Sequence, residues 1–398
     1  LIVKFGKYFK IDSITFFYTI FLKVNFNLFL LNCKHMQSKQ TLRFSRKDSK
    51  NFFKTLNHRV NTYFKKNKIR KTGNWKLYLK SSLMFILLLG PYFLVYTLEI
   101  SLWVKLIMCI IMGVGMAGVG MNVMHDGNHG SFSKHPLVNK LMGSSIYILA
   151  GNVFNWKIQH NLLHHTYTNI HGHDEDIDPG NILRFSKHSP WFPYHRFQHL
   201  YSIFLYGLLT INWAIFADFK QMKSYTSRKL TYLNSKSASL QWIGLIISKI
   251  IYFSVWLIIP LIFIEASWWA IIIGFIIMHY TAGLILSIVF QLAHVMEDAS
   301  MPKADRTGTM KNTWAIHQLL TTVNFSTKNR FINWFTGGLN HQIEHHIFPN
   351  ISHIHYSKIG KIVKQTAKEF NLPYNEYKTT RSAIFSHFKF LKQMGLQP

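Results

Sequence analysis

The chain has 398 residues, of which 48% are hydrophobic and 15% are charged, and its formal net charge is +29. This length would suffice for one large or two ordinary soluble domains, but the apolar residues are gathered in long blocks. Only Cys33 and Cys109 are present, which excludes a disulfide framework and a thiolate metal site and is compatible with a reducing compartment. The composition therefore favours a membrane protein.

The N-terminal residues 1–35 begin with Leu and are dominated by Phe, Leu, Ile, Asn and Lys. No small-residue cleavage site follows their most apolar stretch, so a secretory signal is not expected. We expect this segment to be upstream translation before a start at Met36, or else an extra hydrophobic segment.

A strongly basic segment follows, with fifteen Lys or Arg residues and a single acid, Asp48, between Lys34 and Lys80. Nucleic acid binding is one interpretation of this charge. We favour a juxtamembrane segment over residues 36–78, because the positive-inside rule places such charge in the cytoplasm, where anionic headgroups attract it. Within it, apolar residues at helical spacing over Ser49–Lys68 predict an amphipathic helix that lies on the membrane.

Four apolar blocks each approach or exceed the roughly 20 residues that cross a bilayer core. They form two close pairs, and the short links within the pairs predict two antiparallel transmembrane hairpins. The blocks are Leu79–Leu98, Leu102–Met121, Leu240–Ile264 and Trp268–Ala293. Residues 79–398 are therefore predicted to form one membrane domain.

The first histidine cluster, His-Asp-Gly-Asn-His, lies about one turn beyond the second block. His125 and His129 are four residues apart, so they share one helical face and can bind one metal. Such a pair by itself is weak evidence. It resembles a zinc protease motif, but Asp126 stands where that motif requires a general-base Glu.

The second cluster, His-Asn-Leu-Leu-His-His, spans residues 160–165. On an α-helix, His160 and His164 share a face, whereas His165 points about 100° away. Adjacent histidines with divergent directions can serve two different metals.

The third cluster, His-Gln-Ile-Glu-His-His, repeats the double histidine at His345 and His346, with His341 and Gln342 before it. The three clusters contain eight imidazoles at ligand spacing. Because a catalytic zinc needs three protein ligands and a structural zinc four, this number favours two metals. Imidazole suits iron, copper, nickel or zinc, so spacing alone leaves the metal open.

A joint metal site requires all three clusters on one side of the membrane. If the apolar stretch Leu200–Phe216 crossed fully, the third cluster would lie opposite the first two. We therefore predict that Leu200–Phe216 and Leu141–Phe154 are interfacial or re-entrant. The predicted fold is all-α, with two transmembrane helical hairpins (four spans) and a cytoplasmic helical cap that holds a histidine-rich di-metal site.

Further polar residues lie near the clusters. His294 ends the fourth block at the depth of His125 and is predicted to be a further ligand. His279 lies about 22 Å earlier on the same helix, too far to reach the same metals, and is expected to line a cavity or pair with a neighbouring helix. Several carboxylates are candidates to accept the second N–H of a ligating imidazole. They are Asp126, Glu344, Glu297, Asp174, Glu175, Asp176 and Asp178.

In order and in position relative to the two hairpins, HDGNH, HNLLHH and QIEHH closely resemble the three histidine boxes of membrane fatty acid desaturases. Gln342 at the start of the third box resembles the front-end, linoleoyl-CoA-desaturase-like branch. The resemblance implies two non-haem irons, and Gln342 stands where other branches of the family usually have a ligand, so that His341 is an alternative candidate. Asp126 and Glu344, which lie within the boxes, remain candidates as partners of ligands. The implied ligands are His125, His129, His160, His164, His165, His294, His345 and His346.

The implied reaction uses O2 to remove two hydrogens from adjacent methylenes of a fatty acyl-CoA or acyl-lipid, which yields a cis double bond and water. No His-Pro-Gly-Gly haem motif occurs, so a separate donor, a ferredoxin or a cytochrome b-type protein, is expected to supply electrons. We expect a multi-pass protein with a cytoplasmic active site, in the inner membrane if the source is bacterial, that contacts membrane lipid and no nucleic acid. A di-iron hydroxylase or ketolase acting on another lipid is the nearest alternative, and a histidine-rich metal transporter is a more distant one.

Overall fold

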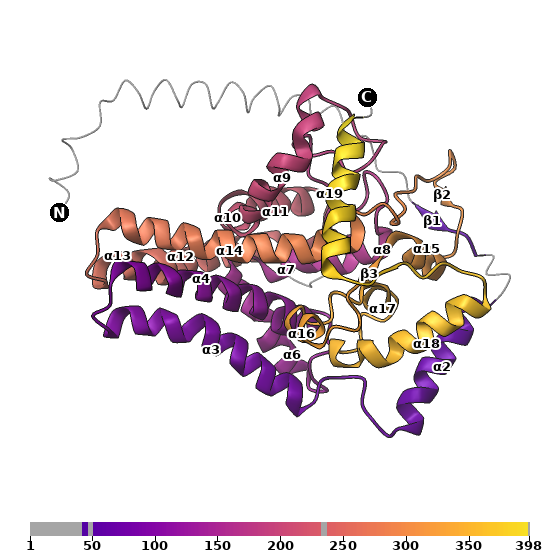
Figure 1. Cartoon of the computed structure of the whole chain (residues 1–398), viewed down its shortest axis with the longest axis horizontal. Coiled ribbons are helices and arrows are strands. Elements are labelled where there is room, and N and C mark those ends of the chain that lie inside the picture. Colours follow the sequence, from indigo (N-terminus) through magenta and orange to yellow (C-terminus); the bar gives the residue numbers. More distant parts are fainter. Residues whose placement is uncertain (1–41, 47–50, 232–236, 397–398) are drawn as a thin grey trace.

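The computed structural model describes residues 42–46, 51–231 and 237–396, and these are mostly helical (Figure 1). The segment predicted over residues 1–35 lies outside this part of the chain. Four helices are long and apolar enough to cross a membrane, and they match the four predicted blocks. These helices run over Trp75–Thr97, Leu102–Asn128, Ala238–Phe263 and Trp268–His294.

Two of the four long helices carry π-helical turns. In each hairpin, one helix is α-helical throughout and the other contains a π-helical segment but runs without a break (Figure 1). The first hairpin consists of α3 (Trp75–Thr97), α4 (Leu102–Val119), the π-helical η2 (Gly120–Met124) and α5 (His125–Asn128). The second consists of α12 (Ala238–Phe253), the π-helical η8 (Ser254–Ile258), α13 (Ile259–Phe263) and α14 (Trp268–His294).

Local signals explain where these helices begin. The Asn74 side chain accepts a hydrogen bond from the backbone N–H of Lys76 at 3.0 Å and so caps α3. Ser101 caps α4 in the same manner, immediately after the short link. In the apolar windows of the four helices only 28–39% of residues are buried within the protein, so most apolar side chains face outward, as they do in a lipid-exposed bundle.

Both apolar stretches that were predicted not to span are broken. Leu141–Phe154 is divided among α6 (Pro136–Gly143), a 3-10 turn (Ser144–Leu149) and α7 (Val153–Trp156). In the other stretch, the helices over Pro193–Gly207 and Leu209–Ser227 are bent by 62° relative to each other. If this bent pair crossed the membrane as one span, the described residues would contain five spans.

A buried ion pair fixes the bent segment to the second hairpin. Lys249 of α12 donates to Asp218 Oδ2 at 2.7 Å, and both side chains are less than 10% exposed. Lys249 also donates to the backbone oxygen of Trp213 at 2.7 Å. It donates as well to the backbone oxygen of Ala150. These three contacts in a buried site make the ammonium a structural link, because its charge is paired and hydrogen-bonded.

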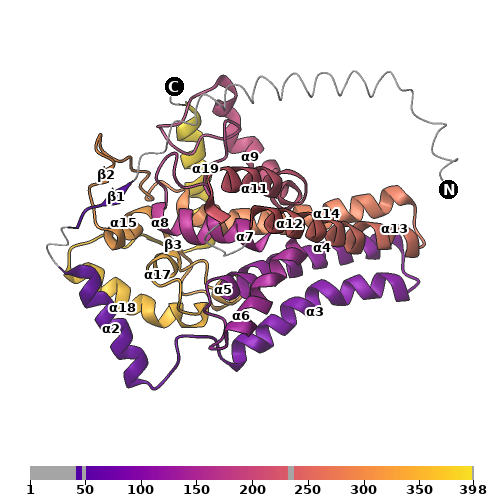
Figure 2. The same cartoon turned by 180° about the vertical axis from the view of Figure 1, so that it is seen from behind.

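Most of the remaining elements form a cap at one end of the hairpins, whereas residues 198–212 pack along α14 (Figure 2). Short parallel pairs β1–β2 and β3–β4 are the additions to the predicted all-α fold. The remaining helices are α2 (Phe52–Lys66), α8 (His165–Tyr167), α9 (Gln198–Gly207), α10 (Leu209–Asn212), α11 (Asp218–Ser227), α15 (Trp314–Thr321), α16 (Arg330–Phe335), α17 (Gln342–Ile347), α18 (Tyr356–Glu369) and α19 (Thr380–Leu396), and the strands are β1 (Arg43–Phe44), β2 (Thr309–Met310), β3 (Asn324–Phe325) and β4 (Glu376–Tyr377).

The amphipathic helix α2 forms as predicted, but its apolar face does not lie on the membrane. Phe52, Leu56 and Val60 are fully buried in a core shared with Ile359 and Val363 of α18. The sequence expectation was wrong here because α18, about 300 residues downstream, is itself amphipathic and presents a complementary apolar face.

The first hairpin depends on a close backbone approach at Gly115. A Cβ atom at this position would lie 2.5 Å from the backbone nitrogen of Leu88 in α3. Small residues allow such approaches between transmembrane helices. Gly244 in α12, by contrast, has open space around its Cα.

We therefore expect Gly115→Ala to force α3 and α4 apart and to cost about 1–3 kcal/mol. Gly244→Ala should be neutral or slightly stabilising, because alanine favours the helix and meets nothing. Thermal unfolding of the two detergent-solubilised variants, followed by fluorescence, would compare them with the original chain. Equal midpoints for both variants would contradict the close approach.

Candidate metal centre

The histidine clusters meet where both hairpins end in the cap. His125 lies on α5, which continues the second long helix without a break, so the predicted gap of one turn beyond the span is absent. His294 is the last residue of α14. The other clusters come from the π-helical η4 (Lys157–His164) with α8, and from α17. All predicted clusters therefore gather at one end of the bundle.

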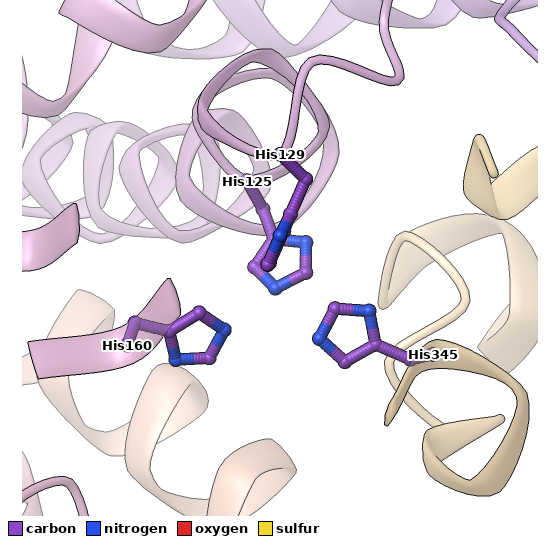
Figure 3. Close-up of side chains that lie close together, drawn as sticks. All are labelled: His125, His129, His160 and His345. Atoms are coloured by element: carbon purple, nitrogen blue, oxygen red, sulfur yellow. The ribbon is translucent and has the colours of Figure 1, made fainter. Parts of the chain in front are cut away.

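One group consists of four histidines whose rings point toward a common centre (Figure 3). His125 and His129 enter from the end of the second long helix, His160 from η4 and His345 from α17. One ring nitrogen of each lies within 4.8 Å of the corresponding nitrogens of the others. This arrangement matches the separation of donors around one metal ion.

A second group joins His164, His294 and His346, and it meets the same distance limit. All three side chains are fully buried. His165 forms a further group with His345 and His346, between the other two. His345 thus belongs to the first group and His346 to the second, and both also belong to the group of His165.

The backbone of the second cluster differs from the predicted α-helix. Residues 157–164 form a π-helix, in which hydrogen bonds join residues five apart. His160 Nε2 therefore lies 3.3 Å from His165 Nε2, whereas an α-helix would have pointed His165 away. The prediction that His160 and His164 alone share a face was incomplete, because the wider turn brings His165 toward His160 as well.

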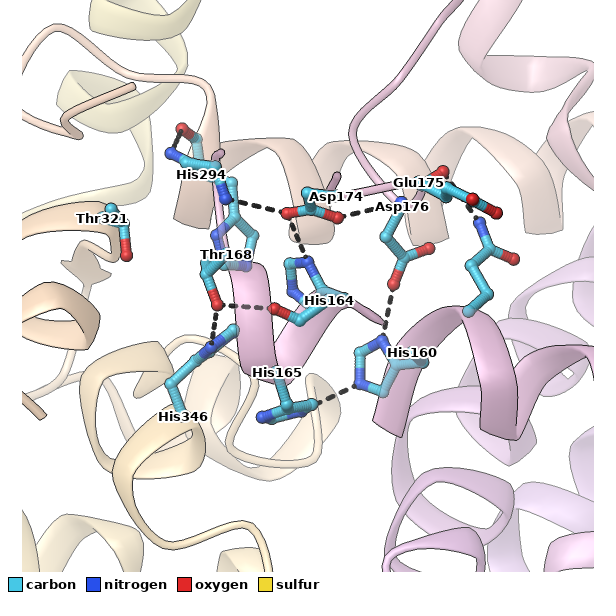
Figure 4. Close-up of polar contacts among 12 residues, drawn as sticks. His160, His164, His165, Thr168, Asp174, Glu175, Asp176, His294, Thr321 and His346 are labelled. Carbon is cyan, nitrogen blue, oxygen red and sulfur yellow. Dashed lines mark hydrogen bonds and ion pairs between the residues drawn. The ribbon is translucent and has the colours of Figure 1, made fainter. Parts of the chain in front are cut away.

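An acidic loop binds the outer nitrogens of the second cluster (Figure 4). His164 Nδ1 lies 2.8 Å from Asp174 Oδ2, and His160 Nδ1 lies 2.6 Å from Asp176 Oδ2. The backbone N–H of Asn169 also donates to Asp174, at 2.8 Å, which fixes that carboxylate. Carboxylates in this position orient an imidazole so that its Nε2 faces a metal.

The third cluster has partners that the sequence did not indicate. His345 Nδ1 lies 3.1 Å from the hydroxyl of Tyr356, and His346 Nδ1 lies 2.9 Å from Gln318 Oε1. The second cluster has an additional partner as well: the indole ring of Trp156 stacks on the ring of His160, with centroids 4.4 Å apart. These partners come from other elements and belong to no recognisable motif, so no signal in the sequence identifies them.

The inward nitrogens fit a metal. Among the described residues, several converging histidines have a buried Nε2 atom without a hydrogen-bond partner; they include His125, His129, His164, His345 and His346. An unpaired polar atom in a buried site is costly unless something binds it. A cation coordinated by these nitrogens would remove that cost.

The electrostatics favour neutral rings, which are the form that binds metals. Burial, together with repulsion from neighbouring histidines, holds the pKa values of His129, His165 and His345 well below the usual range. Burial alone would also lower the pKa of His164, but Asp174 next to it raises that pKa overall. A bound cation and a proton would compete for this ring.

The four residues predicted as further ligands or partners lie outside the histidine groups. Asp126 Oδ2 accepts from Ser352 Oγ at 2.7 Å and lies 3.0 Å from His353 Nδ1. Glu344 is hydrogen-bonded to Asn324 and Tyr374, which anchors α17. His341 Nδ1 lies 3.6 Å from Glu344, and Gln342 is buried and interacts with His294.

Other residues singled out in the sequence lie away from the rings. Glu297 pairs with Lys389 of α19 at 2.8 Å, and Glu175 pairs with Arg228 at 2.7 Å. Asp178 accepts from the backbone of Gly180 in a turn. His279 is buried in α14, where it contacts Thr210 and Tyr252 from neighbouring helices, which is the second of its two predicted roles.

Comparison with known proteins names the family. The sequence model described as fatty acid desaturase matches residues 101–378. The chain is 38% identical over 351 residues to the sn-1 linoleoyl-lipid 6-desaturase of Arthrospira platensis, which covers 87% of this chain and 93% of that protein. It is 32% identical over 369 residues to the sn-1 linoleoyl-lipid 6-desaturase of Synechocystis sp., covering 90% and 99%.

A third relative is the acyl-lipid (8-3)-desaturase of Physcomitrium patens, which is 34% identical over 365 residues, or 90% of this chain and 74% of that protein. The residues that the family model matches include all three histidine boxes and three of the four long helices. With its four apolar helices and its converging histidines, this multi-pass membrane protein belongs to the fatty acid desaturase family.

Proposed function

We propose that the protein introduces a cis double bond into the acyl chain of a membrane lipid, on the carboxyl side of an existing double bond, with O2 as the oxidant. The observation that carries this proposal is the convergence of eight histidines, seven of them buried, at one end of two apolar hairpins. The printed names of the relatives, which are acyl-lipid desaturases of the 6 and 8-3 types, support an acyl-lipid carrier over acyl-CoA.

Two metal ions are part of the proposal. The group of His125, His129, His160 and His345 would hold one, and the group of His164, His294 and His346 the other. His165, between the groups, would contribute to either. A single catalytic zinc needs only three protein ligands, so eight imidazoles exceed one site. Family membership supports iron as the metal.

The bound irons would supply the O2-dependent oxidation that an unactivated C–H bond requires. The protein's own task is to hold the donors. Asp174 and Asp176 accept the Nδ1 protons of His164 and His160, which fixes the tautomer that turns Nε2 inward. Burial of the site keeps bulk water away from the reacting carbon chain.

The same proposal includes the side of the membrane and the electron source. The basic residues of segment 36–78 favour a cytoplasmic cap, by the positive-inside rule. A separate ferredoxin or cytochrome b-type protein would deliver the electrons. Both assignments rest on charge and on family resemblance.

Lipid analysis tests the reaction. Expression of residues 36–398 in a host with a compatible donor should yield a new cis-unsaturated fatty acid in the membrane lipids, detected by gas chromatography. A host that makes the same chain with His164→Ala is the control. A new hydroxylated product without a new double bond would instead favour the hydroxylase.

The metal assignment predicts that His164→Ala abolishes desaturation and lowers iron per chain by about half or more, because one group keeps only two donors. His58→Ala is a matched control, since His58 is an exposed histidine of α2. Iron is measured by plasma emission spectrometry on the purified protein. Unchanged iron in the His164 variant would refute the assignment.

The orienting role of the acidic loop predicts that Asp174→Asn weakens iron retention about 10- to 100-fold, as loss of such partners commonly does. The substitution preserves shape but removes the negative charge beside His164. Asp178→Asn, in the exposed turn of the same loop, should retain iron normally. Retention is followed by titration with a chelator, and equal release from both variants would contradict this role.

A further inference from the structure

A second polar site lies beside the histidine groups, in a cavity of about 660 Å³. Its walls come from the start of α3, from α16 and the residues that follow it, and from the turn after the third histidine box. The cavity is therefore at the end of the first hairpin where the cap begins. None of the eight converging histidines lines it.

The wall of this cavity is cationic. Lys76, Lys80 and Arg330 line it, together with the imidazoles of His341 and His353. Among its described lining residues there is no Asp or Glu. A concave surface with several cations and no facing carboxylate attracts an anion.

Two of these groups are built into the fold. Lys80 is only 5% exposed, its Nζ lies 3.0 Å from His353 Nε2, and it lies 5.7 Å from the ring centroid of Trp334. His341 is 4% exposed, and both of its ring nitrogens lack a hydrogen-bond partner among the described residues. A buried imidazole without a hydrogen bond and a buried lysine therefore line the same cavity, and buried polar groups of this kind point to a ligand.

The rim of the cavity is apolar. Leu79 and Leu83 lie on the outer side of α3 and are 55% and 42% exposed, and Trp75 at the start of the helix is 67% exposed. Exposed Leu and Trp at the end of a transmembrane helix lie at the level of lipid headgroups. The cavity thus combines a cationic wall with a rim that suits acyl chains.

We propose that this cavity binds the phosphate-bearing headgroup of an acyl lipid and so positions the substrate's polar end beside the metal centre. The proposal rests on the proposed function and adds its substrate class. His341 links the two sites, because the backbone N–H of His345 donates to the oxygen of His341 at 3.0 Å, one helical turn away. A phosphate on coenzyme A shares the chemistry, but the Leu79 and Leu83 rim favours a lipid.

The test uses the full iron-loaded protein in detergent, with two exposed cations of the cavity neutralised. The variant is Lys76→Gln combined with Arg330→Gln, and the control is Lys361→Gln, an exposed lysine of α18 that does not line the cavity. Native mass spectrometry measures binding of phosphatidylglycerol, of a neutral galactosyl diacylglycerol and of oleoyl-CoA. Iron content is recorded for each protein.

We expect the double variant to bind phosphatidylglycerol about tenfold more weakly, since each charge-assisted contact to phosphate contributes about threefold to tenfold. Galactolipid binding, iron content and the control should be unchanged. With the acyl chain presented on phosphatidylglycerol in vesicles, KM should rise by a similar factor while kcat stays within about twofold, because the cavity binds substrate without touching the reacting carbons.

Equal affinity of the original chain and the double variant for phosphatidylglycerol would overturn the proposal. So would tighter binding of oleoyl-CoA that the same substitutions weaken, because the phosphate would then belong to the coenzyme. If the original chain binds phosphatidylglycerol in this way but desaturates no acyl carrier, the cavity stands and the proposed function fails. If the protein desaturates the acyl chain but the substitutions leave KM unchanged, the proposed function stands and the headgroup site fails.

Discussion

The structure depends on one constraint: eight imidazoles must lie close together at one end of the bundle, almost all of them buried, with ring nitrogens turned toward one another. Burial lowers the pKa of His165 and His345 and so favours their neutral form, whereas Asp174 raises the pKa of His164. Orientation needs a partner for the outer nitrogen. For His164, His160, His345 and His346 this partner is Asp174, Asp176, Tyr356 and Gln318, respectively, from three separate parts of the cap. The acidic loop, α15 and α18 therefore fold around the histidines.

The hairpins place this site at the end of an apolar bundle. Both α5 and α14 deliver a histidine at their last turns, and the close approach at Gly115 keeps the first hairpin compact. The cap then closes over the rings, with α2 packed on α18. An acyl chain in the bilayer and its headgroup at the surface would thus meet different parts of one site: apolar helices below, and the cationic cavity around Lys80 at the rim.

Local patterns in the sequence were sufficient to predict the four long helices and the clustering of the histidines. Hydropathy located the four long helices to within a few residues at most ends, and their polar ends extend one or two turns further because helical hydrogen bonding continues past the apolar block. The repeated double histidine indicated that neighbouring rings can serve different metals. The position of His294 at the end of the fourth block, at the depth of His125, indicated that it lies near the clusters. Asp174 and Asp176 were among the carboxylates predicted to orient an imidazole, but the sequence did not distinguish them from Glu175 and Asp178.

The sequence by itself therefore determined which residues make up the membrane helices and which histidines gather. Hydropathy indicates the helices, and the spacing of the histidines indicates the clusters. The tertiary structure decided how they gather. The π-helical turn that brings His165 to His160 is not favoured by any local signal and depends on packing around it. Tyr356 and Gln318 contact the rings from elements whose positions only the folded chain fixes. The apolar face of α2 is buried against α18, because the two amphipathic helices present complementary apolar faces.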